Sequence, residues 1–269
     1  MESLYLPLLK ALFRLNPLAL SRAGGTVSTT SVKSEVENGV PVTRLSLRAV
    51  GPLVFTATAC VVTLGIFQEV YTRILGEETI LRGMPQIALD GELNVGAWYS
   101  SALMILSAIG LFLTGRVQRD VPEGRAPLPW YALAVIFVGL SIDESASFHE
   151  ILGDPLRNAL DTGGLLYFAW VIPGAIFTLT VGVLFIPFLL TLPRGVAVRF
   201  VVAGAIFVGG ALGMELLEGN LADKGEMGSV LFMVFVIIEE AMEMFGIALF
   251  LSTVVTHLVS VQPKWQLEQ

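Results

Sequence analysis

Long apolar segments separated by short polar connections dominate the chain from residue 49 onwards. A helix rises 1.5 Å per residue, so about 20 apolar residues cross the roughly 30 Å hydrocarbon core of a bilayer. Six segments reach this length: 49–71, 95–115, 130–150, 165–192, 198–218 and 229–257. Because a segment in lipid must satisfy its own backbone hydrogen bonds, each is predicted to be a helix. The pattern therefore predicts an all-α fold, a six-transmembrane-helix bundle with antiparallel neighbours.

The two ends of the chain lack such segments. Residues 1–48 begin with leucines mixed with Lys10 and Arg14 and continue into a Ser/Thr/Val/Gly-rich stretch. This composition predicts an amphipathic segment in the membrane interface followed by a flexible linker. The predicted organisation is an N-terminal segment and linker (1–48), a six-helix transmembrane domain (49–258) and a short tail (259–269).

Composition supports a membrane protein and excludes some other classes. The 269 residues are 54% hydrophobic and 14% charged, with a mean hydropathy of +0.76. A soluble domain carries about 25% charged residues. No basic stripe interleaved with aromatic residues occurs, so nucleic acid is not an expected partner. Cys60 is the single cysteine, which rules out an intrachain disulfide and a cysteine metal site.

Lysine and arginine are distributed unequally between the two sides of the predicted bundle. Twelve fall on one side and four, Arg73, Arg82, Arg157 and Lys224, on the other. Basic residues concentrate in cytoplasmic loops, so both termini are predicted to be cytoplasmic. The loops near 73–94, 151–164 and 219–228 are then predicted to face outward.

Acidic residues occur inside four of the six apolar segments, and one of the two histidines accompanies them. Counting along each predicted helix places them at similar depth, between the bilayer middle and its outer surface. Their convergence predicts an outward-facing cluster of carboxylates and one His within the membrane. The members are Glu69, Asp143, Glu144, His149, Glu150, Glu215, Glu218, Glu239, Glu240 and Glu243.

Spacing assigns some of these residues to common helix faces. Residues three or four apart lie on one face, as do Glu215 with Glu218 and Glu239 or Glu240 with Glu243. His149 falls on a different face from Asp143 in a straight helix. It joins the cluster only if the helix opens near residues 145–147 or a loop folds over.

No lysine or arginine lies in the interior of a predicted span to neutralise these acids. An ionised acid near the bilayer centre costs at least about 2.5–3.5 kcal/mol. Three arrangements avoid this cost: the acids share protons, they line a water-filled cavity, or a multivalent cation holds them ionised.

The metal hypothesis is favoured because carboxylates from several helices of one bundle resemble carboxylate metal centres. An almost all-oxygen ligand set suits Mn²⁺, Ca²⁺, Mg²⁺ or Fe, whereas zinc, which prefers more His or Cys, is disfavoured. The nearest ligands are expected to be Asp143, Glu144, Glu240 and Glu243, followed by Glu215 and His149. An enzyme of this kind would use metal-activated water or oxygen on a membrane-soluble substrate. No residue is assigned a catalytic role, and no other cofactor is expected.

Two alternatives stay open. Intramembrane carboxylates also carry protons in pumps, so a proton- or cation-coupled transporter or proton relay is one alternative. Against it, no inverted repeat is detectable, and the inner halves of the spans carry no acids. A non-catalytic membrane sensor or assembly partner is the other.

Some features have a structural interpretation. Gly209 and Gly213 have the spacing that lets a neighbouring helix approach closely. Aromatic residues near span ends, among them Trp170, are typical interfacial anchors.

Three stretches resemble one family: LSIDESASFHE, LPRGVAVRFVVAGAIFVGGALGMELLEG and IIEEAMEMFGIALFL. They are similar to a family of uncharacterised bacterial multi-pass membrane proteins, over roughly residues 130–257. In that family a span ending in DE…HE precedes a Gly-rich span ending in an acid, and the last span carries EE-x-x-EM-x-G. The resemblance implies a bacterial inner (cytoplasmic) membrane, with lipid as the surrounding partner, and carries no established activity. The sequence leaves the oligomeric state open.

Overall fold

The structure is a computed structural model that describes residues 49–75, 84–91, 93–119 and 126–261. All of these residues belong to one compact unit, 45–269. The described residues form helices and connecting turns and no strand, as the sequence predicts. The predicted N-terminal segment and linker lie outside the described residues, as does the tail from residue 262.

Six helical stretches are long and apolar enough to cross a membrane, and they match the six predicted spans. The fold is therefore an all-helical six-span bundle. In chain order the elements are α2 (Val50–Leu75), η4 (Pro85–Ile87), α3 (Val95–Arg119), α4 (Leu128–Ala146), α5 (Phe148–Leu160), η5 (Gly164–Leu166), α6 (Val171–Thr191), α7 (Arg194–Val208), η6 (Gly209–Met214), α8 (Glu215–Asp223) and α9 (Val230–Val261).

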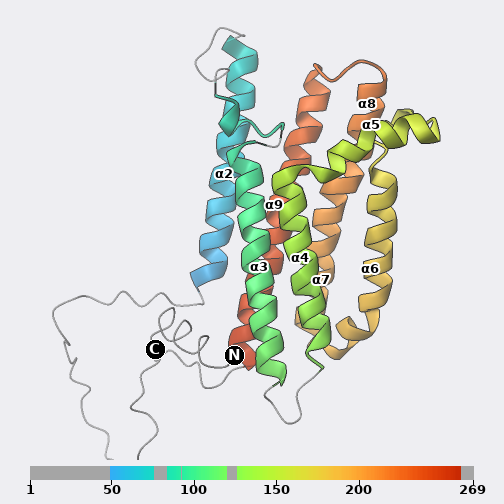
Figure 1. Ribbon diagram of the computed structural model, residues 1–269. Helices are drawn as coiled ribbons and strands as arrows, with labels where there is room; N and C mark the ends of the chain where they lie inside the picture. The colour runs from blue at the N-terminus through green and yellow to red at the C-terminus, as the bar shows by residue number, and fades with distance from the viewer. Residues whose placement is uncertain (1–48, 76–83, 92, 120–125, 262–269) are drawn as a thin grey trace, which may run out of the picture. The chain divides into compact units, whose positions relative to one another are not determined.

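The spans run alternately up and down, and α9 is the central one (Figure 1). It packs against α2, α3, α7 and α8, whereas α6 lies at the edge and contacts chiefly α7 and η6. The start of α2 and the end of α9 lie at the same end of the bundle, here called the far end. The opposite end, crossed by α5, is called the α5 end. The described parts of the loops predicted to face outward lie at the α5 end.

The third span ends earlier than predicted, because the helix breaks at Ser147. This residue has a left-handed backbone with φ of 53°, and its N–H donates to the Asp143 carbonyl at 2.7 Å. The chain then turns into α5, a short helix with Phe148, Ile151 and Leu152 exposed. A left-handed residue stops a helix because it points the next peptide away from the helix axis. The break is the opening near residues 145–147 that the placement of His149 requires.

The fifth span contains a π-helical segment, η6, between α7 and α8. A Cβ added at Gly210 would lie 2.9 Å from the Glu239 backbone oxygen of α9, and one at Gly246 would lie 2.8 Å from the Phe207 nitrogen. Glycine at both positions therefore allows the two spans to approach closely. Gly213 has nothing within 4 Å of its added Cβ. A Cβ added at Gly209 would lie 2.9 Å from Met242 Cε of α9, so the close approach uses Gly209 and Gly210 but not Gly213 of the predicted pair, because the wider π turn rotates Gly213 away from α9.

Aromatic side chains close the far half of the bundle. Trp130 of α4 is fully buried and meets Phe188 of α6 edge to face, with ring centroids 4.9 Å apart. Phe250 of α9 stacks on Phe137 at 4.4 Å and on Phe200 at 4.6 Å. These rings join α4, α6, α7 and α9 at the far end. Toward the α5 end, α4 and α6 do not pack closely on each other.

Candidate functional site

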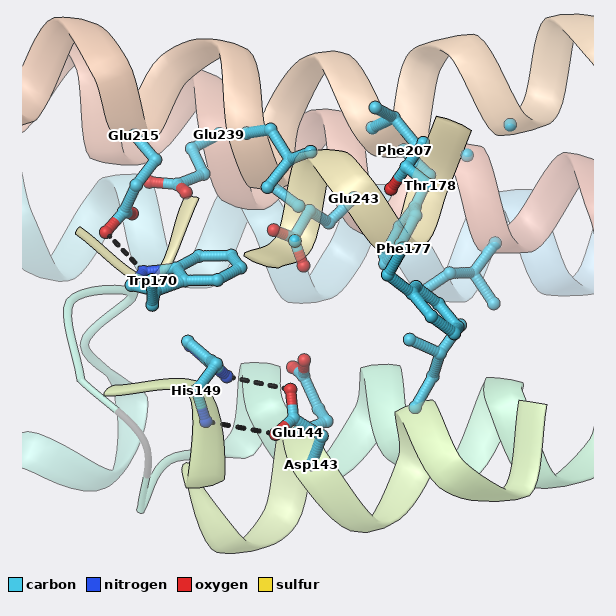
Figure 2. Close-up of a pocket in the computed structure, with 18 of the residues that line it drawn as sticks. Asp143, Glu144, His149, Trp170, Phe177, Thr178, Phe207, Glu215, Glu239 and Glu243 are labelled. Carbon is cyan, nitrogen blue, oxygen red and sulfur yellow. Dashed lines mark hydrogen bonds and ion pairs between the residues drawn. The ribbon is translucent and has the colours of Figure 1, made fainter. Parts of the chain in front are cut away.

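A cavity of about 1290 Å³ lies inside the bundle, between α4 and α5 on one side and α6–α9 on the other. This exceeds the roughly 300–1,000 Å³ of most small-molecule pockets. Figure 2 shows its polar part, where Glu215, Glu239 and Glu243 face Asp143 and His149 across the space. Of the residues predicted to form the cluster, all line this cavity except Glu69.

Three carboxylates from two spans form the tightest group in the cavity. Glu215 and Glu218 begin α8, directly after the π-helical segment, and Glu239 faces them from α9. One ligand oxygen of each lies within 4.8 Å of the others. Glu215 and Glu218 lie on one helix face, as predicted, and both are therefore close to Glu239. The group differs from the expected nearest ligands, because Asp143, Glu144, Glu240 and Glu243 line the cavity without joining it.

Glu218 is the most deeply buried acid in this group. Only 4% of its surface is exposed, and its Oε1 is buried without a hydrogen-bond partner in the described structure. Leaving a buried carboxylate oxygen unpaired costs about 1–3 kcal/mol or more. Glu218 Oε1 is therefore the atom of this group that can accept a further partner.

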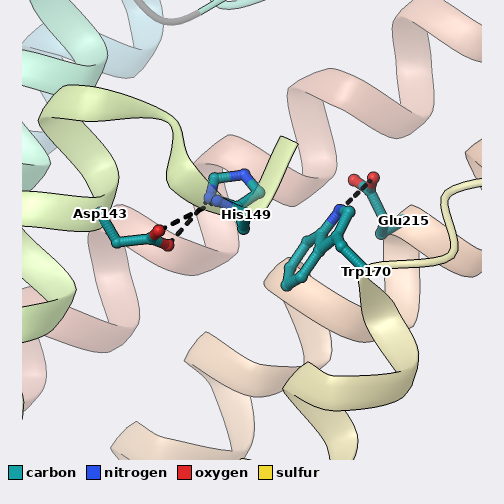
Figure 3. Close-up of polar contacts among 4 residues, drawn as sticks. All are labelled: Asp143, His149, Trp170 and Glu215. Atoms are coloured by element: carbon teal, nitrogen blue, oxygen red, sulfur yellow. Dashed lines mark hydrogen bonds and ion pairs between the residues drawn. The ribbon is translucent and has the colours of Figure 1, made fainter. Parts of the chain in front are cut away.

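Asp143 and His149 form a pair at the corner between α4 and α5 (Figure 3). The His149 backbone N–H donates to Asp143 Oδ1 at 3.1 Å, and the ring Nδ1 lies 2.9 Å from Oδ2. A carboxylate only accepts hydrogen bonds here, so the pair selects the ring tautomer with a proton on Nδ1. Asp143 therefore stabilises the turn between α4 and α5 and sets the orientation of the His149 ring.

Trp170 connects this corner with the opposite side of the cavity. Its ring lies 4.5 Å from the His149 ring between centroids, and its Nε1–H donates to Glu215 Oε1 at 2.9 Å. The sequence indicates only an interfacial anchor at this position. Spacing could not reveal more, because Trp170 follows the α5–η5 turn, whose path the apolar pattern does not define.

Glu69 lies near the cavity without lining it. It sits on α2 beside Leu89, Asp90 and Arg73. Arg73 also donates from Nη1 and Nη2 to the backbone oxygens of Gly228 and Ser229, at 3.3 and 3.1 Å. Glu69 therefore belongs to the contacts between α2 and the connecting segments at the α5 end.

Three charged residues outside the predicted spans also line the cavity: Asp90, Asp154 and Arg157. Arg157 of α5 donates to Asp154 at 2.7 Å and lies over the Tyr167 ring at 4.1 Å. Asp90 precedes α3, and loss of solvent around its carboxyl raises its pKa above the ordinary value, although the residue as a whole is exposed. The sequence could not place these three residues, because they lie outside the predicted spans.

The acids greatly outnumber the bases on the described cavity wall. His149 and Arg157 are its basic residues. Its acidic residues are Asp90, Asp143, Glu144, Glu150, Asp154, Glu215, Glu218, Glu239, Glu240 and Glu243.

The remainder of the cavity is apolar and extends toward the aromatic cluster at the far end. Phe177 of α6 and Phe207 of α7 line this part, which we call the apolar arm (Figure 2). Its other walls include Leu133, Phe137, Val181, Phe200, Gly204, Val208 and Ala211. The cavity thus has one acidic end and one hydrocarbon-like end.

The six apolar helices and this cavity indicate a multi-pass helical membrane protein with an acidic cluster inside the helical bundle. Residues 48–258 match the family model described as "Domain of unknown function (DUF8692)", so the chain belongs to that family. This confirms the sequence-based expectation of an uncharacterised family with no established activity. No curated protein and no solved structure matches the chain.

Proposed function

We propose that the protein is a membrane metalloprotein that binds a divalent cation through Glu215, Glu218 and Glu239 and acts on a membrane-soluble substrate. The observation that carries the proposal is the meeting of three carboxylates from two spans, with their ligand oxygens within 4.8 Å and one buried oxygen unpaired. The proposed location is the bacterial inner membrane.

Ligand geometry supports a hard divalent cation. Calcium–oxygen distances are about 2.3–2.6 Å, and magnesium–oxygen distances are about 2.0–2.1 Å. Two oxygens bound to one ion are therefore separated by at most about 4.6–5.2 Å for calcium, which is compatible with the 4.8 Å spacing, and by about 4.0–4.2 Å for magnesium, for which the carboxylates would move closer together. Oxygen ligands favour Mg²⁺, Ca²⁺, Mn²⁺ or Fe²⁺ over zinc.

The Asp143–His149 pair supports a hydrolytic reaction. A bound cation lowers the pKa of a coordinated water and polarises a carbonyl or phosphoryl group. An imidazole oriented by a carboxylate is a common general base, and His149 would take a proton from a substrate group on its own side of the cavity. The two groups lie on opposite sides of the cavity, with Trp170 between them, so a substrate would lie across both.

The aromatic cluster favours this function over transport. A transporter needs a route to both sides of the membrane. Here the polar part of the cavity lies toward the α5 end, whereas Trp130, Phe188 and Phe250 fill the far half of the bundle. A site that opens on one side suits binding and catalysis better than passage.

Elemental analysis of the full chain, purified without chelator, tests the proposal. We expect about one equivalent of a divalent metal, and at least a tenfold lower affinity in Glu239→Gln, because even partners of metal ligands contribute about 10–100-fold. Glu226→Gln is the matched control, since Glu226 is exposed and lies outside the cavity. Less than about a tenth of an equivalent in the unaltered chain would overturn the proposal.

A further inference from the structure

We propose that the cavity binds a long-chain amine, with the chain in the apolar arm and the ammonium group among the carboxylates. This inference rests on the proposed function and deepens it by naming the substrate class. Three independent features carry it: the length of the arm, its accessibility from lipid, and the charge at its polar end.

The apolar arm has the dimensions of a lipid chain. Cavity-lining residues of α7 and η6 run from Phe200 to Leu212, which corresponds to about 18 Å along the helix axis. This matches the roughly 15 Å of hydrocarbon in one leaflet. The aromatic cluster ends the arm at the far end, so a bound chain would have its terminal methyl there.

The arm is accessible from the hydrocarbon of the membrane. Its walls on α6 and α7 include Phe177, Ile186 and Val201, which are 48%, 50% and 54% exposed. Over this stretch α4 and α6 do not pack closely on each other. An amphiphile already in the bilayer, with its chain parallel to the spans, can therefore enter sideways without leaving lipid.

The polar end favours a cation over an anion. Its acidic residues outnumber His149 and Arg157 so strongly that a bound divalent ion would leave a negative surplus. Arg157 is already paired with Asp154 and stacked on Tyr167. An ammonium group brings three hydrogen-bond donors and a positive charge, and carboxylates bind such donors more strongly than neutral ones. An anionic headgroup would meet like charge.

Two glycines provide a matched pair of variants for the arm. Gly204 lies at the centre of the cavity-facing side of α7, and a Cβ added there meets nothing within 4 Å. Gly204→Phe is therefore expected to fill the arm without touching the acids. Gly139 of α4 also has open space around an added Cβ, but it does not line the cavity. Gly139→Phe is the control for the same substitution outside the arm.

The experiment measures retention of three probes by the full chain released from lipid nanodiscs, using native mass spectrometry. The probes are hexadecylamine, hexadecanol and hexadecyl phosphate, which share a chain and differ in headgroup. We expect preferential retention of the amine, about tenfold weaker retention in Gly204→Phe, and no change in Gly139→Phe. Equal retention of the alcohol or the phosphate would overturn the headgroup assignment, and equal behaviour of the two glycine variants would overturn the chain site.

Metal content of the same samples separates this inference from the proposed function. Metal binding without amine retention would overturn the inference alone. Amine retention in a protein without metal would overturn the proposed metal centre and leave the amine site standing.

Discussion

The carboxylates on the two sides of the cavity have different partners. On the α4–α5 side, Asp143 accepts hydrogen bonds from the backbone and ring of His149, at 3.1 and 2.9 Å. On the α8–α9 side, Glu218 and Glu239 approach each other and Glu215 without a basic residue in the group. The carboxylates thus differ in role: Asp143 stabilises a turn and orients a ring, whereas Glu215, Glu218 and Glu239, called the glutamate trio, form the group that we propose to bind a cation.

The largest expected effect is on the free energy of unfolding, and it separates the role of Asp143 from that of the glutamate trio. The experiment compares Asp143→Asn with Glu218→Gln in the presence of chelator. Asp143→Asn removes an ionised acceptor from His149, so we expect the free energy of unfolding to fall by about 1.5–3 kcal/mol. Glu218→Gln removes like-charge repulsion and supplies an amide donor, so we expect it to rise by about 1 kcal/mol. Thermal unfolding in detergent measures both changes. Destabilisation by both variants would mean that the glutamate trio is held together by the protein alone.

A smaller effect is expected where the two spans of the trio approach each other. Gly210→Ala places a Cβ 2.9 Å from the Glu239 backbone oxygen, so the spans must separate. We expect a loss of about 1–3 kcal/mol in unfolding free energy and a lower metal content. Gly213→Ala is the matched variant, because its Cβ meets nothing, and should be neutral or stabilising by about 0.5–1 kcal/mol. Similar results for Gly210→Ala and Gly213→Ala would show that close approach at Gly210 is not needed to bring the three glutamates together.

The smallest expected effect concerns the corner on the opposite side. Ser147 has φ of 53°, which costs a non-glycine residue about 1–2 kcal/mol. Ser147→Gly should therefore change the unfolding free energy by less than about 1 kcal/mol, whereas Ser147→Val should destabilise because β-branched residues avoid positive φ. Neither should alter metal content if the corner and the trio are independent. Loss of metal in Ser147→Val alone would show that the corner positions the trio through Trp170.

The six spans could be predicted from the sequence because each is long, apolar and bounded by polar residues. The i,i+3 spacing of Glu215 and Glu218 also predicted their common face, since it depends only on local helix geometry. The partner of this pair could not be predicted. Spacing alone does not distinguish Glu239 from Glu240 or Glu243, because which of them faces α8 depends on how far the π-helical segment rotates the chain.

The corner at Ser147 shows where local reasoning stops. The sequence indicated that His149 could reach the cluster only through a break in the helix or a loop that folds over, without showing which of the two occurs. Serine has no intrinsic preference for a left-handed backbone, and contacts made after the turn, above all His149 with Asp143, stabilise it. Trp170 was missed for a related reason: its contact with Glu215 joins residues 45 positions apart.

By itself, the sequence determined six segments long and apolar enough to cross a membrane and the presence of acids within four of them, because hydrophobic length depends only on local composition. The tertiary structure decided which acids meet, which one is paired with His149, and that an apolar arm adjoins them. Those outcomes depend on helix rotation, on a break at one serine and on close approach at Gly210, and these are set by contacts between spans.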